Sequence, residues 1–138
     1  MIRFEKMNIP EHTYLYEDAT AAAEYTNGTF GTVTSGVFTA GAGNKAIVQV
    51  EYGDNAYSDA FTVKAGEHVR VANFEAAPEG EIVNITDDEL PATYSVGGKL
   101  KPASTGKLTV NATGALFEII EKTRYGVRAK VLAVASSN

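Results

Sequence analysis

Few residues in this chain have the types and spacing that catalysis or metal binding requires. His12 and His68 are the two histidines, and they lack the close spacing that brings two imidazoles to one metal. The chain has no cysteine, which excludes disulfides, thiolate metal ligands and cysteine nucleophiles. Ser35 lies in a stretch without the first glycine of a nucleophile elbow. We therefore expect a protein that is not an enzyme and that uses no metal or cofactor.

Two further motifs have a functional and a structural interpretation. The run Gly41–Ala46 matches the glycine spacing of a dinucleotide-binding loop, but that loop must open a helix, whereas Ile47–Val50 is typical of a strand. We expect a hairpin turn there. The acidic run Asp87–Glu89 could attract calcium, yet it lacks the spaced ligands and the glycine of a calcium loop. We expect one helical turn instead, with Thr86 as its N-cap and Pro91 ending it.

The elements that must position any site are strands. The chain contains 14 Thr and 13 Val, residue types that favour strands, and Gly, Asn and Asp interrupt it at short intervals. This pattern predicts an all-β fold, a small antiparallel β-sandwich or barrel of short strands. We expect an extended N-terminal arm beside it and at most one or two short helical turns. The choice between sandwich and barrel stays open.

Several segments predict particular elements. Apolar and polar residues alternate over Lys45–Tyr52, His68–Asn73 and Val127–Val134, as in half-buried strands. In the second of these, His68 shares the polar face with Arg70. Further strands are expected at Glu81–Ile85 and Leu116–Ile120, and a hairpin from Lys99–Ala103 to Lys107–Val110. The alanine-rich stretch Asp18–Tyr25 predicts a short helix, of marginal length.

The domain organisation that we expect is an N-terminal arm over residues 1–16 followed by a single β-rich domain over residues 17–138. The arm is apolar but has no clean period, and a single Pro10 interrupts it. Such an arm could add a strand to the exposed sheet edge of a partner. The alternative is that this segment is the first strand of the core. The candidate contact residues are Ile2, Phe4, Met7, Ile9, Tyr14 and Tyr16.

Charge divides the chain into two unequal parts. Residues 1–98 hold five basic and 15 acidic residues, whereas residues 99–138 hold seven basic and two acidic ones. Acidic and basic strands could pair within one sheet, or the basic part could form a face aimed at an acidic partner. For the second interpretation, the anchoring residues would be Arg124, Arg128 and Lys130. For the first, they would pair across strands with acidic residues such as Glu118 or Glu51.

The same composition argues against two classes of partner. The sequence pI is about 5.0, and nucleic-acid binding usually needs a dominant basic surface, so we expect no nucleic-acid partner. No apolar run approaches the roughly 18 residues of a membrane span, and the charged start is followed by no apolar segment typical of a secretory signal. We therefore expect no membrane partner.

The layout of the sequence resembles that of the head decoration, or cement, proteins of tailed bacteriophages, which are encoded beside the major capsid protein. The likeness is one of Gly-punctuated short strands, and it lies in Asn27–Val33, Val63–Val71, Gly80–Thr86, Tyr94–Leu100 and Glu121–Ala129. The resemblance implies a structural protein of the virion, made in the host cytoplasm, that binds the major capsid protein on the capsid exterior. It also implies a homo-oligomer, either a dimer or a trimer.

Two other classes of binding protein stay open. A module of the phage tail or baseplate would recognise glycans, with tyrosines in place of the tryptophan that this chain lacks. An OB-type binder of single-stranded nucleic acid would use a small barrel and the basic C-terminal part, although the net acidic residues 1–98 count against it.

Overall fold

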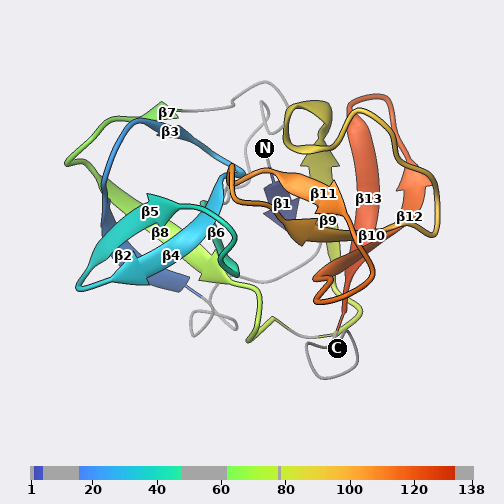
Figure 1. Ribbon diagram of the computed structural model, residues 1–138, viewed down its shortest axis with the longest axis horizontal. Helices are drawn as coiled ribbons and strands as arrows, with labels where there is room; N and C mark the ends of the chain where they lie inside the picture. Colours follow the sequence, from blue (N-terminus) through green and yellow to red (C-terminus); the bar gives the residue numbers. More distant parts are fainter. Residues whose placement is uncertain (1, 5–15, 48–61, 78, 133–138) are drawn as a thin grey trace.

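A computed structural model describes residues 2–4, 16–47, 62–77 and 79–132 of the chain. The fold is all-β, as the sequence predicts, and it has two main units. The units are a small closed barrel and a six-stranded sheet, which lie on the left and on the right of Figure 1. Within the described residues, the helical structure is one 3₁₀ turn, η3 (Asp87–Glu89).

Five short strands close into the barrel. Their order around it is β2 (Tyr16–Ala21), β5 (Val37–Ala40), β4 (Phe30–Thr34), β6 (Lys45–Ile47) and β8 (His68–Asn73). A parallel pairing of β2 with β5 closes it, and the other pairs are antiparallel. Its interior is small and apolar, and holds Ala19, Ala21, Phe38, Ile47, Val69 and Val71. A closed barrel leaves no sheet edge open to unwanted pairing.

The helix expected over Asp18–Tyr25 is wrong. Its first half belongs to β2, and its end belongs to β3 (Tyr25–Thr26), which pairs with β7 (Thr62–Val63). Ala19 and Ala21 are buried in the barrel interior, whereas the intervening Thr20 is exposed. The small alanines suit the narrow interior of a five-stranded barrel, so tertiary packing overrides their helix propensity.

The second unit is antiparallel throughout. Its strands follow the order β1 (Ile2–Phe4), β9 (Ile82–Thr86), β13 (Gly126–Val131), β12 (Phe117–Lys122), β10 (Lys99–Pro102) and β11 (Leu108–Val110). The predicted hairpin is confirmed as β10 and β11, joined by the turn before Lys107. The alternation predicted for β13 is confirmed as well, because Val127, Ala129 and Val131 are buried.

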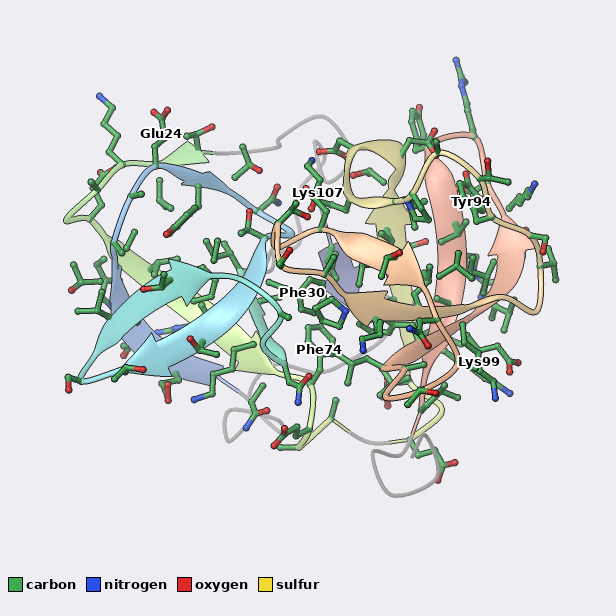
Figure 2. All side chains as sticks on the ribbon, in the orientation of Figure 1. Glu24, Phe30, Phe74, Tyr94, Lys99 and Lys107 are labelled. Atoms are coloured by element: carbon green, nitrogen blue, oxygen red, sulfur yellow. The ribbon has the colours of Figure 1, made fainter. Side chains whose placement is uncertain are left out.

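An aromatic cluster joins the barrel to the sheet. Phe30 of β4 and Phe74, which follows β8, lie outside the apolar interior of the barrel. Their rings pack on each other and on Phe117 of β12, with ring centres 5.0 to 6.0 Å apart. All three side chains are almost fully buried within the larger of the two apolar cores. Figure 2 labels Phe30 and Phe74 between the two units. This shared core makes the barrel and the sheet parts of one packed structure.

The turn at Gly41–Asn44 is not the hairpin that we expected. It joins β5 to β6, but these two strands lie on opposite sides of β4 and pair with β4 rather than with each other. Gly31 of β4 pairs with Ala40 on one side and with Lys45 on the other. The four-residue segment therefore passes over β4 at Gly31. We call residues 41–44 the arch.

The start of the chain belongs to the core sheet. β1 pairs with β9, and Ile2 is fully buried in the larger core. Residues 2–4 thus form a strand of the core, which was the alternative to an extended arm for this part of the chain. Residues 5–15 lie outside the described residues, and Tyr16 begins β2.

The helical turn expected after Thr86 is confirmed as η3, which stops at Leu90 before Pro91. Thr86 occupies the N-cap position, but its hydroxyl donates a hydrogen bond to the Asp88 carboxylate rather than capping a backbone N–H.

Candidate functional site

Two aromatic rings and two cations gather at one end of the six-stranded sheet. The Lys122 ammonium lies 5.1 Å from the centre of the Tyr94 ring, and the Arg124 guanidinium lies 5.6 Å from that of Tyr125. Both distances are typical of cation–π contacts. Tyr125 is 48% exposed, and the nearby loop residue Val96 is 59% exposed. These five residues are called the cationic tip below; Figure 2 labels its Tyr94, beside the strands of the sheet.

The hairpin between β12 and β13 positions the cationic tip. Arg124 and Tyr125 occupy its turn, which the Thr123 N–H closes by donating to the Gly126 carbonyl at 2.8 Å. A side chain at Gly126 would meet the Ile85 carbonyl oxygen, because its Cβ would lie 2.0 Å away. The glycine therefore lets β13 lie close to β9 at the base of the tip.

Asp87 ties the two tyrosines of the tip together. The Tyr94 hydroxyl donates to Asp87 Oδ1 at 2.9 Å, and the Asp87 N–H donates to the Tyr125 carbonyl at 3.0 Å. The hydrogen bond to the Asp87 carboxylate raises the pKa of Tyr94, so the phenol stays protonated. The loop after Tyr94 runs along β12, where the Gly97 N–H donates to the Ile119 carbonyl. The tip is thus held in place before any partner arrives.

The predicted anchors Arg128 and Lys130 are engaged in cross-strand ion pairs. Arg128 Nη1 lies 2.7 Å from Glu121 Oε2, and Lys130 Nζ lies 3.4 Å from Glu118 Oε2. Each pair follows the β12–β13 register. Both residues therefore pair across strands instead of forming a free basic face. Glu118, the partner of Lys130, is one of the two acidic residues that the sequence indicated for such pairing. Of the three predicted anchors, Arg124 is the one that the structure places in the cationic tip.

Among the described residues, the ion pairs do not join the basic part of the chain to the acidic part. In the barrel, Glu17 pairs with Lys45 at 3.0 Å, and Asp18 contacts His68 and Arg70 at 3.2 and 3.3 Å. Every ion pair between described residues joins partners from the same part of the chain. In Figure 2, Glu24 lies on the barrel side and Lys99 on the sheet side.

Several cations on the sheet unit lie outside these ion pairs. Among the described residues, no carboxylate lies within ion-pair distance of Lys99, Lys101, Lys122 or Arg124. The Lys107 ammonium donates to a backbone carbonyl, that of Asp88. The described barrel residues 16–47 and 62–77 carry five acidic and three basic side chains, whereas the described sheet residues 2–4 and 79–132 carry seven acidic and eight basic ones. The barrel is therefore acidic, and the positive charge of the sheet unit is local to these cations.

The other predicted contact residues are distributed differently. Ile2 is buried and so is not accessible to a partner in this structure. Phe4 is paired through its backbone with Val83 of β9, and Tyr16 with Ala72 of β8. Met7, Ile9 and Tyr14 lie outside the described residues, so their proposed contacts stay predictions.

The histidine and the acidic residues that the sequence marked as candidate ligands contact neighbouring side chains in the fold. His68 is exposed on the polar face of β8 beside Asp18, as predicted. The three acidic residues of η3 differ in environment: Asp87 and Asp88 accept hydrogen bonds from Tyr94 and Thr86, whereas Glu89 is 1% exposed. Burial, with the neighbouring Asp88 carboxylate, raises the pKa of Glu89. No group of three metal-ligating side chains occurs in the described part of the chain.

Sequence patterns did not connect three of the five residues of the cationic tip with the other two. Tyr94, Val96 and Lys122 come from two segments that are distant along the chain, and nothing in their spacing links them. The available signal was the Gly97-Gly98 turn, which lets the loop return to β12 through the bond to Ile119.

Comparison with known proteins finds no family model, no curated relative and no solved structure that matches this chain. No helix within residues 2–4, 16–47, 62–77 and 79–132 has the length and apolar character needed to cross a membrane.

Proposed function

We propose that this chain is a head decoration protein of a tailed bacteriophage, which binds the outside of the assembled shell and stabilises the lattice of the major capsid protein. The resemblance in sequence layout motivates the class of protein. The observation that carries the proposal is the cationic tip, a preformed surface on which the Tyr125 ring and two cations are exposed beside the half-buried Tyr94 ring. Neither cation has a carboxylate ion-pair partner among the described residues.

The tip has the chemistry of a contact surface. Tyr and Arg are enriched at protein interfaces because they combine large contact area with directed polar groups. The ring of Tyr125 and the hydrogen bonds through Asp87 already restrict the side chains, so less conformational entropy is lost on binding. A carboxylate on the shell could pair with Arg124 while the tyrosine rings cover apolar surface beside it.

The charge distribution favours a defined orientation on the shell. Because the described barrel residues carry five acidic and three basic side chains, an acidic shell surface would attract Lys122 and Arg124 of the tip and repel the barrel end. Weak contacts of this kind gain strength when linked copies bind neighbouring sites of a lattice together. The residues 5–15 could contribute a strand to the same contact, which stays a prediction.

Co-sedimentation with purified shells of the phage that encodes the chain tests the proposal. The variants Lys122→Glu and Arg124→Glu should reduce the bound fraction at least about tenfold, because each replaces attraction to a carboxylate by repulsion. The matched control is Lys64→Glu, the same charge reversal at an exposed position beside β7 in the barrel unit. It should bind as the unmodified chain does.

Two results would contradict the proposal. Unmodified protein that stays in the supernatant at low salt would remove the shell as partner. Equal losses for Arg124→Glu and Lys64→Glu would show that net charge, rather than the cationic tip, determines binding. Melting temperatures measured in parallel should be unchanged for all three variants, because the substituted side chains are exposed.

A further inference from the structure

A cleft of about 270 Å³ lies in the barrel, where the arch crosses β4. It is remote in sequence from the cationic tip, and the lining comes from β4, the arch, the start of β6 and the end of β8. The residues around it are Gly31, Thr32, Val33, Gly43, Asn44, Lys45, Asn73 and Glu75. Volumes of small-molecule sites begin at about 300 Å³, so this cleft suits one small ring rather than an extended ligand.

Backbone contacts give the cleft its shape. A Cβ on Gly43 would lie 2.0 Å from the Gly31 carbonyl oxygen, and one on Gly31 would lie 2.1 Å from the Thr39 carbonyl oxygen. Neither position can carry a side chain without movement of the backbone. The arch and β4 therefore form a wall of backbone that side chains cannot fill.

The polar groups of the cleft are held in place by one another. The Asn44 amide donates a hydrogen bond to Glu75 Oε1, and the Glu75 N–H donates to Asn73 Oδ1 at 3.0 Å. Lys45 Nζ lies 3.0 Å from both carboxylate oxygens of Glu17. Carboxylate, amide and ammonium groups are thus fixed around a small hollow, and Val33, which also packs against the barrel interior, is part of its lining.

We propose that this cleft binds one neutral hexose ring at the end of a glycan. Adjacent sugar hydroxyls each donate and accept hydrogen bonds, and the fixed carboxylate and amides offer both kinds of partner. The ammonium of Lys45 is already balanced by Glu17, which leaves the Glu75 carboxylate as the remaining charge. An anionic ligand would meet this carboxylate, so neutral sugars should bind better than acidic ones.

This inference does not depend on the proposed role at the capsid, because the cleft and the cationic tip share no residue. A single ring in a shallow cleft makes few contacts, and we expect a dissociation constant on the order of 1 mM.

Titration of ¹⁵N-labelled full-length protein with the methyl glycosides of mannose, glucose and galactose tests the proposal. At least one should give saturable shifts at the amides of Gly31, Gly43 and Asn44, with sialic acid weaker by at least about fivefold. Glu75→Gln should weaken binding at least about fivefold by removing the charged acceptor. Glu79→Gln is the matched control, an exposed glutamate outside the cleft, and it should bind normally.

The outcomes that would overturn the proposal are distinct from those for the shell. Absence of saturable shifts with all three glycosides up to about 100 mM would exclude the site, since that is some hundredfold above the expected constant. Shifts that persist unchanged in Glu75→Gln, or that centre on Tyr94 and Tyr125, would place any sugar binding elsewhere. Shell binding could succeed or fail independently of each result.

Discussion

The carbonyl oxygen of Gly31 faces Gly43 so closely that a Cβ atom at Gly43 would lie 2.0 Å from it. This contact allows four residues to carry the chain from one side of β4 to the other. Because β5 and β6 both pair with β4, the barrel order depends on this crossing. Gly31 and Gly43 thus allow the short connection from β5 to β6 across β4. The same two glycines line the cleft proposed to hold a sugar.

Gly43→Ala should destabilise the fold by about 1–3 kcal/mol or more, because the backbone must move to admit one methyl group. Gly41→Ala is the matched control in the same arch, since its Cβ would meet no atom within 4 Å. Urea unfolding of both variants measures the difference. Equal stability of the two variants would show that the arch can relax at little cost.

Phe74→Ala should cost about 3–5 kcal/mol, because it empties the centre of the aromatic cluster between barrel and sheet. Tyr125→Ala removes a ring of similar size that is half exposed, and should change stability by less than about 0.5 kcal/mol. Thermal unfolding should remain one transition in the unmodified protein. Two separate transitions there would contradict the shared core.

The ion pair of Arg128 with Glu121 should contribute little to stability. Both side chains are partly exposed, so a double-mutant cycle with Arg128→Gln and Glu121→Gln should give a coupling of about 0.2–1 kcal/mol. The coupling should shrink in 1 M salt, roughly ten times the ionic strength at which the Debye length is 10 Å. A coupling above about 2 kcal/mol would mean that the pair is a major element of the sheet.

Glu89 should make stability depend on pH. Its pKa is raised above the ordinary value of 4.5 by burial, so the folded state holds the proton more tightly than the unfolded chain. Stability should therefore fall as the pH rises from 4.5 through the raised pKa of Glu89. Glu89→Gln should remove this pH dependence of the free energy of unfolding. Glu24→Gln, a substitution at an exposed position, should leave it unchanged. Chemical unfolding between pH 4 and 8 provides the measurement; a Glu89→Gln profile parallel to that of the unmodified chain would refute the assignment.

Local alternation was the strongest guide to the fold. His68–Asn73 is β8 with the bounds predicted, because Val69 and Val71 face the barrel interior whereas His68 and Arg70 face outward. The same alternation is present in β2, where Ala19 and Ala21 point inward. The prediction for β2 gave more weight to the helix propensity of alanine than to this alternation. The local sequence does not reveal that these alanines line a barrel interior that requires small residues.

Long-range arrangement could not be predicted in the same way. The glycines of the arch indicate a turn, but a turn signal does not say which strands pair on either side of it. The cationic tip illustrates the same limit, because Tyr94 meets Lys122 through tertiary packing alone. The pairing of Lys130 with Glu118 could be named as an alternative from the sequence, since each lies on the polar face of its strand.

We propose that this chain binds the head of a phage particle through its cationic tip. Electron cryomicroscopy of native particles from the phage that encodes it tests this most directly. We expect density for the barrel and sheet on the outer surface of the head, with the hairpin of Arg124 and Tyr125 against the capsid protein. Mature heads without this density, or density confined to the tail, would exclude binding to the head.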